Sequence, residues 1–239
     1  MNPLKLLVDL IIPRKCHICG EKLGQGEDFI CLSCETELPR TAFHNYWKNT
    51  TGPNTDLNPM EERFAGQIPL VRATSLFFYT RDSTPAQLVH DFKYRGFPNL
   101  AEKLGTLAAR ELSPTGFFDG IDCICPIPLH RLKHHRRGYN QTEMIAQGVS
   151  KVTDIPLSTC LKAVKGHKTQ TSLSREERIA NTKDVFGVRN PELLEGKTIL
   201  IIDDICTTGA TILSAAHAIE KACPSARFSI LTLGFAGMS

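Results

Sequence analysis

Residues 197–211 decide the fold, and they read KTILIIDDICTTGAT. Four consecutive aliphatic residues stand at 199–202, and such a short β-branched run is typical of a strand buried on both faces of a parallel sheet. Asp203 and Asp204 end this predicted strand, and a turn rich in hydroxyl groups follows them. The apolar positions of 212–219 then recur with the period of a helix. The order is therefore strand, acids, turn and helix N-terminus.

This order suits a ligand that carries a phosphate close to hydroxyl groups. The unpaired N–H groups of a helix N-terminus bind anions, threonine hydroxyls add donors, and Gly209 lets the backbone approach a ligand. Carboxylates would repel a phosphate, so Asp203 and Asp204 suit sugar hydroxyls or a hard cation such as Mg²⁺. A ribose 5-phosphate satisfies both requirements. The alternative is an acidic strand end beside an ordinarily capped helix.

The pattern Asp-Asp-x-x-Thr-Thr-Gly-x-Thr resembles the phosphoribosyl pyrophosphate (PRPP) loop of type I phosphoribosyltransferases. This resemblance implies that the two acids hold the ribose, directly or through Mg²⁺, and act as the catalytic residues. It also implies that the loop binds the 5-phosphate of PRPP. The loop residues are Thr207, Thr208, Gly209, Ala210 and Thr211.

The composition is that of a globular protein without a membrane span. The chain has 239 residues, 41% of them hydrophobic and 22% charged, and its net charge of +3 is too small to indicate nucleic acid by itself. The apolar N-terminal run, 4–13, contains Lys5 and Asp9 and is shorter than the roughly 20 residues that a span needs. It lacks a small-residue cleavage site, so we expect a cytoplasmic protein. The run fits a short helix packed on its own protein, with a membrane-surface anchor as the alternative.

Two Cys-x-x-Cys pairs follow this run, a short loop apart. Their spacing predicts a tetrahedral structural zinc site closed by four thiolates. Disulfides are disfavoured in a reducing compartment, and a redox pair would need a single motif within a βαβ unit. His17, inside the first pair, is predicted to point outward as a bystander. The predicted metal ligands are Cys16, Cys19, Cys31 and Cys34.

These patterns divide the chain into three regions. We expect an N-terminal helix and zinc module over 1–40, a connector over 41–69 and a phosphoribosyltransferase-like domain over 70–239. Three aromatic residues would dock the connector: Phe43, Tyr46 and Trp47.

Within the domain, the patterns predict a strand over 73–80 and a helix from an N-cap at Thr84 to a C-terminal cap at Gly96. Further helices are expected over 99–112 and 141–152, and a last strand over 227–233. Three other glycines are predicted turn or cap positions: Gly105, Gly187 and Gly196.

A strand at 123–128 ends in a Pro-x-Pro turn and leads into the most basic stretch of the chain, 130–137. In an α/β sheet, a cationic loop just past the carboxyl end of a strand lies where ligands bind. Three interpretations stay open: contact with a phosphate ligand, contact with nucleic-acid phosphates, and a solvated face. The nucleic-acid candidates are Lys133, Arg136 and Arg137.

The polar segment 165–181 is long for a connection in a compact domain, which indicates a lid or a loop over the site. Arg175 and Arg178 would share a helical face and could close over a pyrophosphate. The alternative is a pair on an exposed helix, with the neighbouring glutamates as partners.

The cysteines outside the two pairs have no ligand spacing and are predicted to be buried thiols. Cys206 stands inside the phosphate loop and is a candidate for oxidation. The set consists of Cys123, Cys125, Cys160, Cys206 and Cys223.

Together these motifs resemble the ComF family, which includes ComFC-like and GntX-like proteins, over almost the whole chain. The resemblance rests on the four-cysteine module and on the segments 92–96, 126–128, 137–141, 170–181 and 203–211. It implies a type I phosphoribosyltransferase fold, an α/β parallel sheet flanked by helices, behind a rubredoxin-like zinc finger. The turn after the first core strand would bind pyrophosphate, and the polar segment would close over the ligand. The residues implied are Pro128, Leu129 and Arg131 in the turn, and Arg175 and Arg178 in the segment.

The resemblance also implies a role in DNA uptake or utilisation, in natural transformation, with single-stranded DNA and a helicase-like protein as partners. One hypothesis is an enzyme that transfers a phosphoribosyl group from PRPP to an acceptor with Mg²⁺; nucleotide salvage would be its metabolic variant. The other is a binding protein that senses PRPP or a nucleotide and binds single-stranded DNA. The sequence shows no clear general base and no recognisable acceptor pocket.

Overall fold

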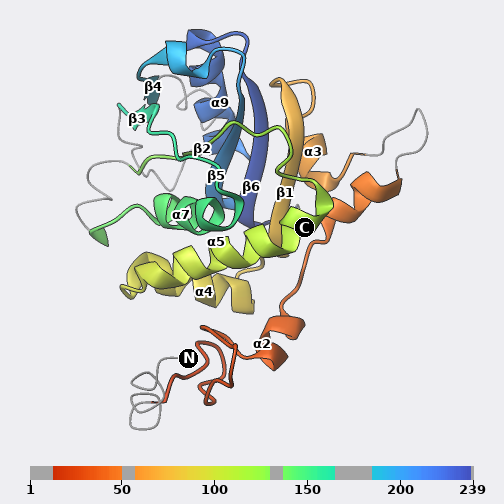
Figure 1. Ribbon diagram of the computed structural model, residues 1–239, viewed down its shortest axis with the longest axis vertical. Coiled ribbons are helices and arrows are strands. Elements are labelled where there is room, and N and C mark those ends of the chain that lie inside the picture. The colour runs from red at the N-terminus through yellow and green to blue at the C-terminus, as the bar shows by residue number, and fades with distance from the viewer. Residues whose placement is uncertain (1–12, 50–56, 130–136, 165–184, 238–239) are drawn as a thin grey trace.

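The computed structural model describes residues 13–49, 57–129, 137–164 and 185–237 (Figure 1). The predicted helix at 4–12, most of the basic stretch 130–137 and the whole polar segment 165–181 lie outside these ranges. Among the helices of the described ranges, none combines the length and apolar content that crossing a membrane requires.

A four-stranded parallel sheet forms the centre of the molecule, in the order β1-β6-β5-β2. Strand β5 (Thr198–Cys206) lies between β6 (Arg227–Phe235) and β2 (Cys123–Pro126), and β1 (Leu70–Phe78) is an edge strand. The carboxyl ends of these strands meet at one edge because all of them run in the same direction. The predicted parallel sheet is therefore confirmed.

Helices cover both faces of the sheet (Figure 1). On one face lie α4 (Thr84–Tyr94), α5 (Pro98–Leu112) and α7 (Gln141–Thr153). Helix α9 (Ala210–Ala222) covers the other face. The predicted fold class, a parallel sheet flanked by helices, is therefore confirmed.

The aliphatic run of β5 supplies the core on both faces. Leu200 and Ile202 belong to the apolar cluster that includes α5 and α7, whereas Ile199 and Ile201 belong to the cluster that includes α9. All four are fully buried. Because both faces of the strand are removed from water, its sequence shows no alternation of polar and apolar residues.

Helices α5 and α7 approach each other closely through two glycines. A Cβ atom at Gly105 would lie 2.1 Å from the carbonyl oxygen of Ile145, and one at Gly148 would lie 2.0 Å from that of Glu102. The prediction of Gly105 as a turn or cap is therefore wrong, because its missing side chain serves the packing of two helices.

Smaller elements complete the domain. Strands β3 (Leu161–Ala163) and β4 (Phe186–Val188) form an antiparallel pair, and Gly187 lies in β4 and not in the predicted turn. The 3₁₀-helix η2 (Ser113–Thr115) follows α5, and the 3₁₀-helix η3 (Pro191–Leu194) precedes β5. Gly196 has a φ of 68° and lies just before β5, which confirms its predicted turn position.

The N-terminal module packs directly on the domain. Helix α2 (Leu32–Glu37) carries its last cysteine. Leu23, Ile30 and Leu38 are buried in the same apolar cluster as the side chains of α5. The module and the domain therefore share one core.

The predicted connector contains two short helices, η1 (Phe43–Asn49) and α3 (Pro59–Phe64). Asn58 begins α3 with a capping box, in which it exchanges hydrogen bonds with Glu61. This local order shows that part of the stretch is a structured element. The division of the chain at 1–40, 41–69 and 70–239 stays a prediction.

Two of the three predicted docking aromatics are confirmed. Phe43 is buried, and the ring of Trp47 stacks on that of Phe117 with centroids 5.5 Å apart. The prediction is wrong for Tyr46, which is 42% exposed, because its ring faces solvent.

Several predicted boundaries are shifted, and two of the shifts concern β5 and α4. Strand β5 continues past the acids to Cys206, because its ladder with β6 includes the pairs Asp203–Thr232 and Cys206–Phe235. The N-cap of α4 is Ser83, whose side chain accepts a hydrogen bond from the third helical residue, so Thr84 is the first residue of the helix and not its cap.

Candidate functional site

The junction of β5 and α9 brings the predicted phosphate-binding residues together. Thr207 and Thr208 are exposed, and Gly209 is the N-cap of α9 with a φ of 79°. Gly209 has no side chain to cap the helix, and Thr208 Oγ1 accepts a hydrogen bond from Ala210 N at 3.4 Å. Exposed hydroxyl groups therefore stand beside a helix N-terminus, an arrangement suited to an anion.

Arg63 of α3 holds the loop between β5 and α9 through hydrogen bonds to the backbone. Its Nη1 atom donates to the carbonyl oxygen of Thr207 and, at 3.3 Å, to that of Ala236. Its guanidinium group lies over the ring of Phe235, 4.4 Å from the centroid. Sequence reasoning missed this residue, because it lies in the stretch predicted to be a connector.

The two acids of the motif lie in different environments. Asp203 is half-buried, and its Oδ1 accepts a hydrogen bond from Asp204 N at 2.9 Å. Asp204 is only 6% exposed and lies against Lys93 of α4 and Gln141 of α7. The predicted role of both acids toward ribose stays a prediction.

The end of β2 lies next to the acids. Pro126 pairs with Ile202 in the parallel ladder, and Ile127 N donates to the carbonyl oxygen of Ile202, so Pro128 and Leu129 follow just past the end of this ladder. The carbonyl oxygen of Ile127 accepts hydrogen bonds from Asn140 Nδ2, at 3.2 Å, and from the hydroxyl of Thr142. The start of α7 therefore fixes the turn that was predicted to bind pyrophosphate.

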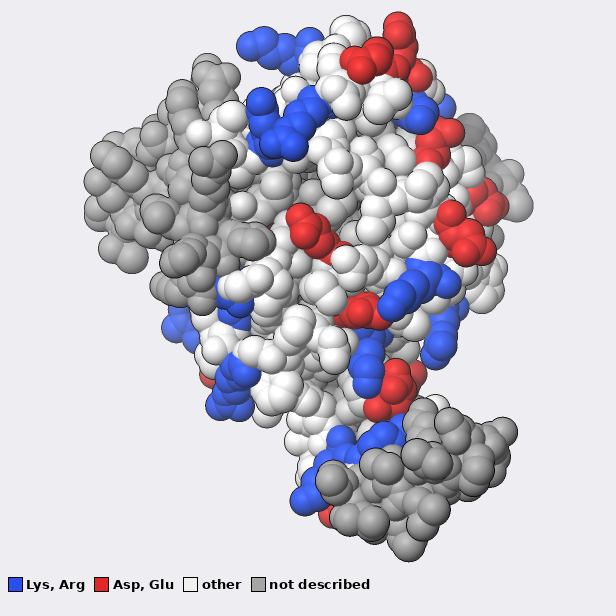
Figure 2. Space-filling view, turned by 60° about the vertical axis from the view of Figure 1, so that its left-hand side comes forward, with Lys and Arg blue, Asp and Glu red and all other residues white. Residues whose placement is uncertain are grey.

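Several predicted ligand contacts fall on residues that the structure does not describe. These are Arg131, Lys133, Arg136, Arg175 and Arg178. Arg137 is described, and its guanidinium group lies over the ring of Tyr94, 5.0 Å from the centroid. On the face drawn in Figure 2, Lys and Arg side chains are interspersed with Asp and Glu side chains over the described residues.

The four predicted metal ligands come together at the N-terminus. Their Sγ atoms all lie within 4.8 Å of one another, and those of Cys19 and Cys31 are 3.7 Å apart. Zn–S bonds of about 2.3 Å in a tetrahedron require sulfur atoms roughly 3.8 Å apart. The four-cysteine cluster therefore fits a structural zinc ion. His17 is not part of the cluster.

The surroundings of Cys16 favour a metal-binding thiolate. Burial opposes its ionisation, but N–H groups of Cys19, Cys31 and Ile18 hydrogen-bond to the sulfur and lower the pKa of Cys16 to about 6. N–H donors stabilise the charged form of a thiol.

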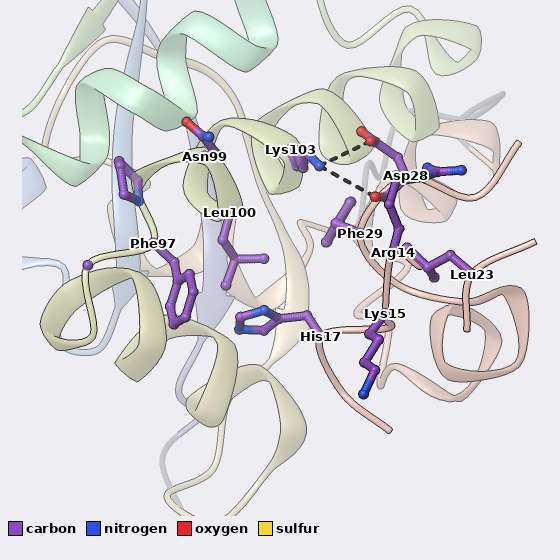
Figure 3. Close-up of a pocket in the computed structure, with 12 residues that line it drawn as sticks. Arg14, Lys15, His17, Leu23, Asp28, Phe29, Phe97, Asn99, Leu100 and Lys103 are labelled. Atoms are coloured by element: carbon purple, nitrogen blue, oxygen red, sulfur yellow. Dashed lines mark hydrogen bonds and ion pairs between the residues drawn. The ribbon is translucent and has the colours of Figure 1, made fainter. Parts of the chain in front are cut away.

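A cavity of about 360 Å³ lies between the module and the start of α5 (Figure 3). Arg14, Lys15 and Lys103 contribute cationic side chains to its lining, and Lys103 Nζ lies 3.0 Å from Asp28 Oδ1. His17, at its edge, packs edge-on against Phe97 with ring centroids 5.0 Å apart.

The prediction that His17 is not a metal ligand is confirmed, because it lies outside the four-cysteine cluster. The prediction that its side chain points outward is wrong. Its Nε2 atom lies 2.9 Å from Oδ2 of Asp91, a buried residue of α4. The side chain points inward because this buried carboxylate requires a partner. The four-cysteine module is thus hydrogen-bonded to α4, the helix that also carries Lys93.

The remaining cysteines are buried and free, as predicted. The Sγ atoms of Cys125 and Cys160 lie 3.4 Å apart, a proximity that spacing in the sequence did not reveal. Burial raises the pKa of Cys206 to about 12, so its thiol stays protonated near neutral pH. This protonation argues against the predicted sensitivity of Cys206 to oxidation.

Residues 140–234 match the family model described as "Phosphoribosyl transferase domain". These residues run from the start of α7 to the end of β6, and they include the acids and the phosphate loop. The match agrees with the parallel topology and with the position of the loop at the β5–α9 junction.

Curated relatives match a larger part of the chain. "DNA utilization protein YhgH" of Salmonella typhimurium is 30% identical over 216 residues, which cover 89% of this chain and 93% of that protein. "Competence protein ComFC" of Bacillus subtilis is 24% identical over 234 residues, covering 91% and 93%. "Competence protein F" of Haemophilus influenzae is 30% identical over 139 residues, covering 56% of this chain and 61% of that protein.

The similarity to YhgH extends over most of both proteins, 89% of this chain and 93% of that one. The family model of the phosphoribosyl transferase domain, by contrast, matches only residues 140–234. From the match to YhgH, the domain match and the four-cysteine module, we conclude that the chain belongs to the ComF family.

Proposed function

We propose that this protein binds PRPP together with Mg²⁺ at the junction of β5 and α9, and that it acts in DNA uptake or DNA utilisation. The observation that carries the proposal is the juxtaposition of an exposed hydroxyl loop, a helix N-terminus and two carboxylates at one edge of the sheet. The loop suits the 5-phosphate, and the acids suit the ribose. A PRPP molecule presents both groups within one ligand.

Each part of the site has its own task in this proposal. Thr207, Thr208 and Thr211, with the N–H groups of α9, bind the 5-phosphate. Asp203, which is half-buried and borders the loop, receives the ribose hydroxyls. The backbone at Pro128 and Leu129 faces the pyrophosphate. Arg131, Arg175 and Arg178 remain the proposed cations for the pyrophosphate.

If the protein is an enzyme, the bond between the ribose C1 and the pyrophosphate oxygen breaks, and an acceptor atom forms the new bond to C1. Positive charge then develops on the ribose, as in glycoside cleavage. Asp203 would stabilise that charge electrostatically, while the phosphate contacts keep the ribose in place. When bound, Mg²⁺ would neutralise the charge of the pyrophosphate leaving group.

The role in DNA handling rests on the relatives, whose names refer to competence and to DNA utilization. Single-stranded DNA is the proposed macromolecular ligand, and a helicase-like protein is the proposed partner. Lys133, Arg136 and Arg137 remain the proposed contacts to DNA phosphates, and Arg14 and Lys15 beside the four-cysteine module supply further cations. In this proposal, PRPP binding is part of a function in DNA uptake or utilisation. The alternative is a metabolic enzyme of nucleotide salvage.

Calorimetric titration with PRPP, with and without Mg²⁺, tests the ligand. We expect binding by the wild type and at least about tenfold weaker binding by Asp203→Asn, because the ribose loses a charged acceptor. Asp122→Asn is the matched control, since Asp122 lies at the opposite, amino end of β5, where it accepts a hydrogen bond from Thr198 N. A wild type that binds no PRPP would refute the phosphoribosyl site.

Two assays then separate the functions. Release of pyrophosphate in the presence of a panel of nucleobases identifies an enzyme, whereas a sensor binds PRPP and releases none. Binding of single-stranded DNA should weaken steeply as salt rises, because phosphate contacts release counterions. DNA affinity that ignored salt would contradict a role for Arg14 and Lys15.

A further inference from the structure

Asp204 is already neutralised by a group of the protein. Lys93 Nζ lies 2.8 Å from Asp204 Oδ1, and Gln141 Nε2 donates to Oδ2 at 2.8 Å. The side chains of Lys93 and Asp204 are only 16% and 9% exposed. Each oxygen of this carboxylate therefore has a donor, and little of either charge faces water.

This arrangement does not suit a divalent cation at Asp204. Mg²⁺ requires oxygen ligands at about 2.0–2.1 Å in a near-octahedral set and gives up its water reluctantly. To reach Asp204, it would have to displace the ammonium group of Lys93 and leave that charge largely buried and unpaired. Unpaired buried charges are strongly disfavoured. The residues around Asp204 thus provide the positive charge that a metal would otherwise supply.

We propose that Lys93 is the resident counter-ion of Asp204, and that Asp204 is a positioning residue and not a ligand of the divalent cation. The ion pair joins α4 to the carboxyl end of β5, and Gln141 joins the start of α7 to the same carboxylate. The carboxylate of Asp204 in β5 therefore connects α4 and α7 to this strand. The two acids then have separate tasks, since Asp203 lies at the edge of the loop and Asp204 holds the framework.

The ion pair between Lys93 and Asp204 is independent of the proposed function. Only its consequence for the Mg²⁺ that accompanies PRPP rests on that function. Cation binding by the ligand-free protein tests the inference separately. Mn²⁺ serves as the probe, because its binding can be titrated by electron paramagnetic resonance. We expect Asp204→Asn to leave the Mn²⁺ affinity of the protein unchanged. A decrease of about tenfold or more in this variant would overturn the proposal.

Removal of the Lys93 ammonium group should allow a divalent cation to bind Asp204. Lys93→Met leaves Asp204 without its counter-ion, so we expect Mn²⁺ affinity to rise by at least about tenfold. The double variant Lys93→Met/Asp204→Asn should lose this gain. Lys151→Met is the matched control, because Lys151 of α7 pairs with Glu102 of α5 and its side chain is 65% exposed. A folded Lys93→Met that gained no affinity would contradict the proposal.

Thermal stability gives a second readout that needs no ligand. Lys93→Met should lower Tm by roughly 5–10 °C, because it strands a buried carboxylate, whereas the double variant should recover part of that loss. If Lys93→Met fails to fold, recovery of folding in the double variant supports the pairing. Failure of both variants to fold, or a double variant with no recovery of Tm, contradicts it.

PRPP binding distinguishes this inference from the proposed function. We expect the Mg²⁺ dependence of PRPP binding to be the same in Asp204→Asn as in the wild type, even where affinity falls through lost positioning. If Asp204→Asn abolishes the Mg²⁺ dependence, Asp204 is a metal ligand and the inference is wrong. If the wild type binds no PRPP, the proposed function fails, while the Mn²⁺ and Tm results still decide the role of Lys93.

Discussion

Gly209 is the residue on which the geometry of the phosphate loop depends. Its φ of 79° lies in the left-handed region, where any side chain is strained. A Cβ atom at this position would also lie 2.8 Å from Cε1 of Phe64, a fully buried ring that cannot move away easily. Glycine is therefore required here both for its backbone conformation and for the close approach of α3.

Gly209→Ala should destabilise the protein and weaken PRPP binding. The positive φ costs about 1–2 kcal/mol, and the contact with Phe64 adds about 1–3 kcal/mol. Gly196→Ala is the matched control, since Gly196 has a φ of 68° but no atom near its would-be Cβ. Urea denaturation should show the larger loss for Gly209→Ala. Equal losses would mean that Phe64 does not restrict the loop.

At the scale of elements, α3 and α4 both support the site, from opposite faces of the sheet. Helix α3 holds the loop through Arg63, whereas α4 holds the carboxyl end of β5 through Lys93. Asp91 of α4 also pairs with His17 of the four-cysteine module. Helix α4 therefore contacts both the four-cysteine module and the carboxyl end of β5.

Arg63→Met should loosen the phosphate loop. It removes the donor to the carbonyl oxygens of Thr207 and Ala236, which should cost about 1–2 kcal/mol after allowance for the partial exposure of Arg63. PRPP affinity should fall about tenfold, because the loop must then be ordered on binding. Arg227→Met, at an exposed position at the start of β6, is the control. Calorimetry and thermal melting measure the two effects, and unchanged affinity would show that α3 does not support the loop.

At the scale of the whole molecule, the module and the domain share a core. Leu23, Ile30 and Leu38 are buried with residues of α5, and Lys103 of α5 pairs with Asp28 of the module. A free energy of about 10–16 kcal/mol accompanies zinc binding in zinc-finger peptides, so metal loss would remove most of what holds the module together. The shared core would then be exposed on one side.

Metal removal should therefore destabilise the entire chain. We expect one zinc ion per chain by elemental analysis, and a lower Tm after treatment with a strong chelator. Cys34→Ser should lose the metal, whereas Cys223→Ser should keep it, because Cys223 is a buried thiol remote from the cluster. Retention of zinc by Cys34→Ser would contradict the four-thiolate site.

The predictions that succeeded were those that depend on residues close together in the sequence. The run 199–202 predicts a buried strand, and each Cys-x-x-Cys pair predicts a knuckle, because both signals lie within a few residues. The local pattern gives the wrong role for Gly105 and the wrong direction for the His17 side chain, although His17 is correctly left out of the metal ligands, since their partners are Ile145 and Asp91. Those partners are brought to them only by the packing of helices.

The sequence by itself determined the parallel sheet, the order of acids and hydroxyls at the end of β5, and the four cysteines of the metal cluster. Only the tertiary structure decided which groups neutralise and support the site. Arg63 reaches the loop across 144 positions of sequence, and Gln141 reaches Asp204 across 63. No local pattern contains such pairs, because a buried charge is matched by whichever side chain the packing of the elements brings within hydrogen-bonding distance.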